Sequence, residues 1–227
     1  MSDIAQNLRA VKERIRQAVH FSQRSPDSVT LVAVSKVHAS SAIREAYTAG
    51  QRHFGENYAQ ELKKKSAELA DLQDIHWHFI GHLQRNKVKF VVPSASLIET
   101  VDSLRLIQEL EQQAAQAERT IHCLVQVNVG GEEQKSGCPP RAAGDLLCAI
   151  EKTKCLAVDG LMTIPPWDLE PEQTRQYFRA LRELRDALGG PKRVPELSMG
   201  MSQDYEIAIA EGATIVRVGT AIFGSRR

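Results

Sequence analysis

The chain has 227 residues, of which 42% are hydrophobic, and this is enough to bury the core of one large domain. Its 29 lysines and arginines nearly balance its 28 aspartates and glutamates, which gives a formal charge of +1. A charge balance this even excludes the strongly basic surface of a nucleic-acid- or membrane-binding protein. No apolar run approaches the roughly 18 residues of a membrane span. Four cysteines without a CxxC pair favour reduced thiols and a cytoplasmic location.

The first predicted element is an amphipathic helix, because Ile4, Leu8, Val11, Ile15 and Val19 share one helical face. Short apolar runs then alternate with longer amphipathic segments that have the helical period. The predicted strands are residues 31–36, 52–56, 76–81, 97–101, 122–129, 158–164, 196–199 and 214–219.

Eight strand–helix repeats of this kind predict an α/β fold, a single (β/α)8 TIM barrel with an extra N-terminal helix. Residues 1–28 would form the helix and its lead-in, and residues 29–227 the barrel, so that 1–227 is one domain. An open, doubly wound sheet with fewer strands is the alternative.

Lys36 lies where the first predicted strand ends, directly after the apolar run LVAV and Ser35. An ammonium group at the rim of a core is unfavourable unless it has a partner or a function. In a closed barrel this strand end adjoins strand eight, and ligands bind at the C-terminal ends of the strands. Lys36 is therefore the first candidate for a binding residue.

Two segments rich in small and hydroxyl side chains follow strands seven and eight, where barrels often bind phosphate. They are ELSMGMSQD (196–204) and RVGTAIFG (217–224), and Ser202 occupies a possible N-cap of a helix beginning near Asp204. Backbone N–H groups and hydroxyls in such loops can hold an anion, although ordinary turns have the same composition. Beside them, Lys36 could pair with a phosphate or form a Schiff base with an aldehyde-bearing phosphate cofactor.

Arg217 has the same strand parity as Ile215 and Gly219. If that parity points inward, a guanidinium lies in the upper barrel and needs an acceptor there. If it points outward, Arg217 pairs with a carboxylate on a helix. The pattern leaves both possibilities open.

An ordered set of motifs, spread from about residue 29 to 224, resembles one known family. The motifs are LVAVSK, HFGENY, WHFIGHLQRNK, QVNVGGEEQKSG, GLMTIP, LSMGMSQD and VRVGTAIFG. Together they resemble the pyridoxal-phosphate homeostasis proteins, single-domain relatives of the N-terminal barrel of alanine racemase. This resemblance implies that Lys36 holds pyridoxal 5′-phosphate (PLP) as a Schiff base and that Arg217 faces the pyridine nitrogen. The other cofactor-binding positions that it implies are Asn57, Ser198, Met201, Ser202, Gly219 and Thr220.

The family pattern contains two further lysines, of which this chain has one. Some relatives carry a second lysine two positions after the cofactor lysine, where this chain has His38, so a role for that lysine does not transfer. Lys135, in the loop GEEQKSG, matches a family loop lysine, and either a contact with the cofactor or a solvated charge is possible.

The resemblance also implies storage and supply of PLP rather than turnover. An arginine at the ring nitrogen does not readily give up a proton, which weakens the cofactor as an electron sink. Racemases of this kind also use a tyrosine from a second domain, and no such domain follows strand eight here. We therefore expect a monomeric cytoplasmic carrier that supplies apo-enzymes. The alternatives are a PLP-dependent amino-acid racemase and a phosphate-ligand enzyme in which Lys36 only pairs with charge.

Two further groups carry no functional prediction. His76, His78 and His82 are close in sequence, but no carboxylate or cysteine completes a metal-ligand spacing, so no metal is expected and packed histidines are preferred. His78 could border the cofactor. The basic run 63–65 is predicted to be a solvated helix face.

Overall fold

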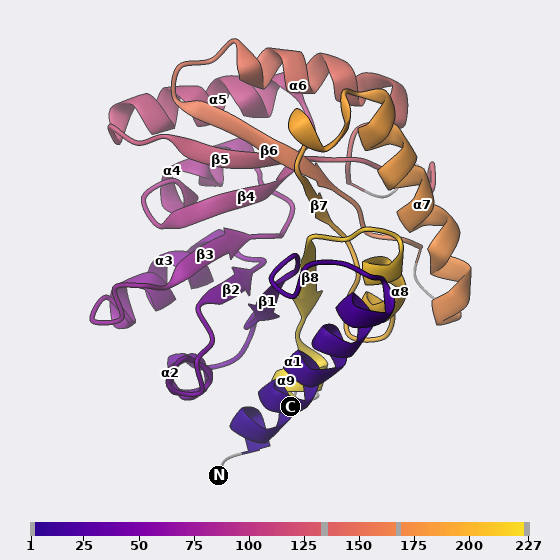
Figure 1. Ribbon diagram of the computed structural model, residues 1–227. Coiled ribbons are helices and arrows are strands. Elements are labelled where there is room, and N and C mark those ends of the chain that lie inside the picture. The colour runs from indigo at the N-terminus through magenta and orange to yellow at the C-terminus, as the bar shows by residue number, and fades with distance from the viewer. Residues whose placement is uncertain (1–2, 133–135, 167–168, 225–227) are drawn as a thin grey trace.

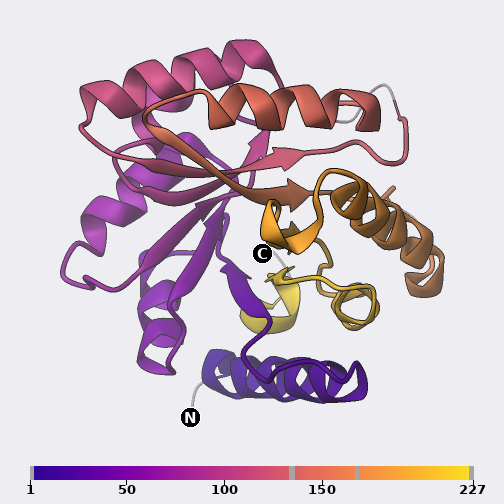
Figure 2. The same cartoon turned by 45° about the horizontal axis from the view of Figure 1, so that its top comes forward.

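The computed structural model describes residues 3–132, 136–166 and 169–224. In these residues eight parallel strands close into a barrel in sequence order, with helices around the outside (Figure 1 and Figure 2). The strands are β1 (Thr30–Val34), β2 (His53–Glu56), β3 (His76–Phe79), β4 (Ala95–Val101), β5 (Ile121–Gln126), β6 (Leu156–Met162), β7 (Glu196–Ser198) and β8 (Ile215–Val218). Because β1 pairs with both β2 and β8, the predicted (β/α)8 barrel is confirmed and the open sheet is excluded.

The helices follow the strands as the sequence pattern predicted. They are α1 (Asp3–Phe21), α2 (Ser40–Thr48), α3 (Ala59–Glu68), α4 (Val88–Val91), α5 (Leu104–Gln116), α6 (Ala143–Glu151), α7 (Pro171–Ala187), α8 (Tyr205–Ala210) and α9 (Thr220–Phe223). Short 3₁₀ turns are η1 (Arg85–Lys87), η2 (Pro140–Ala142) and η3 (Gly190–Lys192). No helix in the described ranges combines the length and the apolar character that crossing a bilayer requires.

The apolar side chains form two cores, as the alternation of side chains in a closed parallel barrel requires. The larger core contains buried side chains from the strands and from the helices that cover them. The smaller one consists of side chains from different strands that meet inside the barrel: Val32, Leu97, Leu124, Met162 and Ile215. α1 joins the larger core through its predicted apolar face and packs along α8 and α9 (Figure 1).

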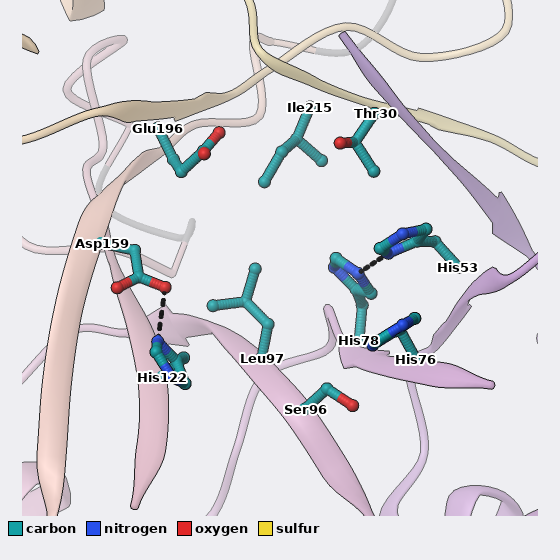
Figure 3. A pocket seen from close by; sticks show the side chains of 10 residues that line it. All are labelled: Thr30, His53, His76, His78, Ser96, Leu97, His122, Asp159, Glu196 and Ile215. Carbon is teal, nitrogen blue, oxygen red and sulfur yellow. Dashed lines mark hydrogen bonds and ion pairs between the residues drawn. The ribbon is translucent and has the colours of Figure 1, made fainter. Parts of the chain in front are cut away.

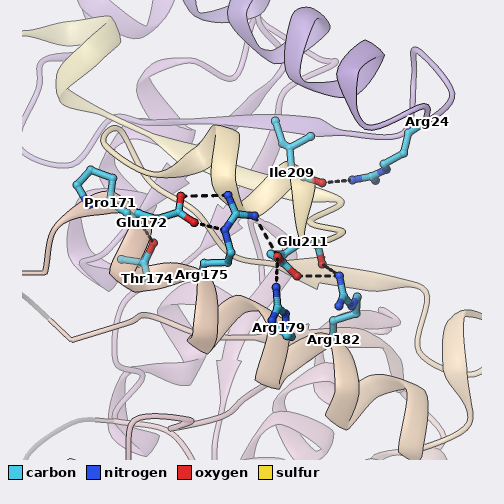
Figure 4. Close-up of polar contacts among 9 residues, drawn as sticks. All are labelled: Arg24, Pro171, Glu172, Thr174, Arg175, Arg179, Arg182, Ile209 and Glu211. Carbon is cyan, nitrogen blue, oxygen red and sulfur yellow. Dashed lines mark hydrogen bonds and ion pairs between the residues drawn. The ribbon is translucent and has the colours of Figure 1, made fainter.

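A buried carboxylate joins α7 to the C-terminal end of α8 (Figure 4). Glu211 is almost fully buried and accepts hydrogen bonds from Arg175, Arg179 and Arg182, with Arg182 Nη1 at 2.8 Å. On the other side of α8, Arg24 donates to the carbonyl of Ile209 at 3.1 Å. These contacts fix the segment that leads into β8, the strand that carries Arg217.

Gly160 should not tolerate a side chain, because β6 and β7 approach closely there. A Cβ atom at Gly160 would lie 2.0 Å from the carbonyl oxygen of Glu196, and this backbone atom cannot move aside without breaking the pairing of β6 with β7. We expect Gly160→Ala to reduce the free energy of unfolding in urea by about 3 kcal/mol or more. Gly144→Ala is the control, since its Cβ would meet only the tip of Leu188 at 3.2 Å and should stay within about 1 kcal/mol of the wild type. Equal losses in the two variants would contradict this account.

Candidate functional site

The loops after β7 and β8 contact each other beside the end of β1. The N–H of Arg217 donates to the carbonyl of Gly200 at 3.0 Å, and the N–H of Gly219 donates to Ser202 Oγ at 3.3 Å. A Cβ atom at Gly219 would lie 3.2 Å from the carbonyl oxygen of Val34, a tight contact, so this loop passes close to β1. The two loops predicted to hold a phosphate therefore lie next to the strand that leads to Lys36.

Arg217 points into the barrel, which decides the question that its parity left open. Only 3% of its surface is exposed. Its guanidinium donates to Ser198 Oγ and, at 2.9 Å, to the carbonyl of Thr163, and it lies 3.8 Å from Glu99 Oε2. Burial lowers the pKa of Arg217, while Glu99 and Asp204 raise it, and an arginine remains protonated in such a setting.

Lys36 lies in a strained turn rather than in the strand itself. β1 ends at Val34, two residues earlier than the predicted strand, and Val37 has a φ of 62°, which is rare for a β-branched residue. Such a conformation is unfavourable by about 1–3 kcal/mol and persists only where the surroundings impose it. Here the N–H of Val37 donates to Glu61 Oε2 at 3.0 Å, so α3 holds the turn that carries Lys36.

A buried ion pair between α3 and β2 also supports this turn. Lys65 Nζ donates to the carbonyl of Ser35 and to Glu56 Oε1, both at 2.8 Å, and Ser35 Oγ donates to Glu56 at 2.6 Å. Burial raises the pKa of Glu56 to about 7, although the hydrogen bonds and charge of Lys65 act in the opposite direction. Lys63, Lys64 and Lys65 were predicted to lie on a solvated helix face; this is confirmed for Lys63 and Lys64 and wrong for Lys65. Lys65 is buried because it faces β2, whereas Lys64 is exposed.

The other predicted cofactor residues also lie at the C-terminal ends of the strands. Asn57 follows β2 and lines a cavity of about 440 Å³ with residues of the loops after β2 and β3. Among the described residues, its Oδ1 atom is buried and has no hydrogen-bond partner. A Cβ atom at Gly81 would lie 2.0 Å from the carbonyl oxygen of Asn57, so these two loops are held in close contact.

The loop after β7 differs in detail from the prediction. The N-cap of α8 is Asp204 rather than Ser202, and Asp204 Oδ1 accepts a hydrogen bond from the N–H of Met201 at 2.7 Å. The Ser202 hydroxyl is instead directed to Gly219. Ser198 is fully buried, and its hydroxyl contacts Arg217 and Glu99 inside the barrel. Ser198 is thus placed to hold Arg217, and Ser202 is placed between the two loops.

Thr220 and His38 also lie at this end of the barrel. Thr220 is the first residue of α9. His38, which replaces a family lysine, stacks on Phe223 of α9 with ring centroids 5.1 Å apart, and so ties the Lys36 turn to the loop after β8. Lys135 lies outside the described residues.

Of the three histidines predicted to be packed, only His78 is buried; His76 is exposed at the N-terminal end of the barrel, and His82 is exposed after β3. His53 and His76 are the first residues of β2 and β3, and His53 Nδ1 lies 3.0 Å from His78 Nε2. His78 Nδ1 lies 2.7 Å from Glu99 Oε1 within the barrel. In the part of the chain that the structure describes, no three His, Cys, Asp or Glu side chains are grouped to hold a metal ion.

Comparison with known proteins gives the same family over the full length. A family model described as alanine racemase, N-terminal domain, matches residues 5–227. The pyridoxal phosphate homeostasis protein of Aquifex aeolicus is 45% identical over 98% of this chain and 98% of its own, and that of Pseudomonas aeruginosa is 45% identical over 100% and 97%.

Solved structures agree with this assignment. PipY of Synechococcus elongatus, solved with PLP bound, has a TM-score of 0.84 at 40% identity, covering 97% of this chain and 100% of that one. Alanine racemase of Corynebacterium glutamicum, at 18% identity and a TM-score of 0.67 over 99% of this chain and 61% of its own, shares the fold. The barrel, the placement of these loops and the full-length similarity show that the chain belongs to the pyridoxal phosphate homeostasis protein family, which is built on the alanine racemase N-terminal domain.

Proposed function

We propose that this protein binds PLP at the C-terminal end of the barrel, as a Schiff base with Lys36, and takes part in keeping the cellular supply of PLP in balance. The observation that carries the proposal is the hydrogen bond between Gly219 and Ser202, which joins the two candidate phosphate loops beside the strand end of Lys36. The PLP-bound PipY structure and the names of the relatives support the choice of cofactor.

The donors present fit the chemistry of this cofactor. The hydroxyls of Ser202 and Thr220 are donors that a phosphate needs, beside Gly219 whose N–H donates to Ser202 Oγ, and Arg217 supplies a buried donor at the ring end. The unpartnered Oδ1 of Asn57 adds a buried acceptor at the same mouth. When bound, PLP supplies a reactive aldehyde: the Lys36 amine adds to it, water leaves and a C=N bond forms.

We further propose that the site stores and hands over PLP in the cytoplasm, as a monomer, rather than using it for turnover. An arginine at the ring nitrogen donates a hydrogen bond without transferring a proton, so the ring remains a weak electron sink. Val37, Tyr58 and Leu104 follow β1, β2 and β4, and each is more than half exposed. Apolar side chains exposed around the mouth support a protein partner that approaches it, such as an apo-enzyme.

The test is to incubate the purified protein with PLP, reduce it with borohydride and map the added mass. We expect an absorption band near the visible edge that reduction removes, with the added mass on the peptide containing Lys36. Lys36→Ala should abolish this fixed adduct, because the amine that forms the C=N bond is gone.

Lys87→Ala is the matched control, since Lys87 lines the cavity beside Asn57 at the same end of the barrel. Its adduct should equal that of the wild type. An unchanged adduct in Lys36→Ala would disprove the assignment of Lys36, and rapid exchange of the α-hydrogen of added alanine with solvent, well above that with free PLP, would favour a racemase.

A further inference from the structure

A continuous line of buried polar contacts crosses the barrel interior from Arg217 toward the N-terminal mouth. Arg217 donates to Ser198 Oγ, and Ser198 donates to Glu99 Oε2. The other carboxylate oxygen, Glu99 Oε1, lies 2.7 Å from His78 Nδ1, and His78 Nε2 lies 3.0 Å from His53 Nδ1. Glu99 and Ser198 have no exposed surface, and His78 and Arg217 are exposed by only 4% and 3%.

The donors and acceptors fix the direction of this line. An ionised Glu99 accepts at both oxygens, so Ser198 must donate from one side and His78 Nδ1 from the other. In a neutral His78, Nε2 is then an acceptor, and His53 Nδ1 donates to it. Burial, followed by the neighbouring His78 and His76, lowers the pKa of His53 to about 4, consistent with a neutral His53 near pH 7.

Glu99 is the acceptor in the middle of the line. Burial alone would raise the pKa of Glu99, but the hydrogen bond of His78, the charge that His78 carries when protonated, the charge of Arg217 and the hydrogen bond of Ser198 together lower it. A buried carboxylate this well satisfied holds Ser198 and, through it, the guanidinium of Arg217 in one geometry.

The far end of the line opens into a cavity of about 190 Å³ at the N-terminal mouth (Figure 3). Besides His78, this cavity is lined by His53, His76 and His122, and by Asp159 and Glu196. His122 belongs to a separate pair, with its Nδ1 2.8 Å from Asp159 Oδ2 (Figure 3). The cavity lies at the opposite end of the barrel from Lys36, because it is formed by residues near the starts of the strands.

We propose that Glu99, held from below by His78, is the positioning residue for Arg217, and that this line couples the cofactor ring to protonation at the N-terminal cavity. The inference rests on the proposed function, since Arg217 is assigned to the ring through it. In the part of the chain that the structure describes, the titratable and charged groups that face the line are His53 on β2, His76 on β3, His122 on β5, Asp159 on β6, Glu196 on β7, Arg217 on β8 and, near Arg217, Asp204 at the start of α8.

The coupling acts through charge at Glu99. A proton taken up by the His53–His78 pair in acid places a positive charge against Glu99 Oε1. The carboxylate is then shared between two cations, and its hold on Ser198 and Arg217 weakens. Because Arg217 faces the cofactor ring, the absorption of bound PLP should report this proton although it is added at the other end of the barrel.

The experiment is to load each variant with PLP and record the absorption of the bound cofactor from about pH 4 to about pH 9. We expect the wild type to show an acid transition. His53→Ala should shift its midpoint, since the histidine at the cavity end of the line, which contacts His78 Nε2, is removed. Glu99→Gln should remove the transition and weaken PLP binding by about tenfold, while reduction still fixes PLP on Lys36.

His122→Ala is the matched control, because His122 lines the same cavity but lies outside the line. Its transition should match that of the wild type, and an equal shift in His53→Ala and His122→Ala would overturn the inference. A wild type without an acid transition would also overturn it, and so would a transition that persists unchanged in Glu99→Gln. If Glu99→Gln fails to fold, the comparison of His53→Ala with His122→Ala decides alone. Absence of a fixed adduct in the wild type would instead reject the proposed function.

Discussion

Replacing Lys65 with methionine is expected to lower the free energy of unfolding by about 3–5 kcal/mol at pH 8, as for other buried ion pairs that lose one partner. The side chains of Lys65 and Glu56 are 7% and 0% exposed, and their charged atoms are 2.8 Å apart. Methionine fills a similar volume but leaves the Glu56 carboxylate without its cation and the carbonyl of Ser35 without its donor. Urea unfolding followed by circular dichroism measures the loss.

The pH dependence of this loss tests its cause. The folded-state pKa of Glu56 is raised from 4.5 to about 7, so the folded protein binds this proton more tightly than the unfolded chain. The resulting stabilisation is fully present below about pH 4.5 and is lost as the pH rises through 7. Lys65→Met should therefore be most destabilising above pH 7 and least near pH 5, where Glu56 is protonated in both proteins.

Lys64→Met is the control for Lys65, because it makes the same change one residue earlier on α3. Lys64 is 75% exposed and lies 3.7 Å from Glu68, so its loss should change stability by about 0.5 kcal/mol or less. A similar effect of the two substitutions, or a loss in Lys65→Met that is independent of pH, would contradict a buried ion pair between Glu56 and Lys65.

The sequence predicted the barrel well because its strands are buried on both faces and its helices are not. A run such as LVAV has no polar alternation, whereas the intervening segments have the helical period, and this contrast located all eight strands to within a few residues. The closed barrel was predicted from the number of strand–helix repeats. The end of β1 was placed too late because Ser35 and Lys36 belong to a turn whose conformation depends on Glu61, a residue 24 positions from Val37.

The polar interior was beyond the sequence pattern. Glu56, Glu99 and His78 are ordinary polar residues within short strands. The pairing of β3 with β4 brings His78 to Glu99, and the packing of α3 against β2 brings Lys65 to Glu56. Two signals were nevertheless present. A glutamate in the middle of the apolar run SLIETV must be paired if it is buried, and Glu61 and Lys65 have the i,i+4 spacing of an ion pair.

Replacing Arg217 with methionine should be as destabilising as the Lys65 change, by about 3–5 kcal/mol, since it leaves Glu99 buried without its cation. The pH dependence has a defined sign. In the wild type the pKa of Glu99 is lowered, so its stabilisation is present above the ordinary carboxyl pKa and is lost in acid. Without Arg217, one of the charges that lower this pKa is gone, so the variant should lose most stability at neutral pH and recover part of it in acid. Urea unfolding at pH 7 and pH 5 measures both values.

Two comparisons separate the buried charge from the rest of the side chain. Arg217→Lys retains the cation but not the fork that reaches both Ser198 and Thr163, so it should recover part of the stability at neutral pH. Arg14→Met removes an arginine that is half exposed and pairs with Glu206 at 2.8 Å, and should change stability by about 1 kcal/mol or less. If Arg217→Met were no worse than Arg14→Met, the charge on Glu99 would not depend on Arg217. Glu99 and Arg217 would then not be coupled, and Arg217 could not transmit a change at His78 to the cofactor ring.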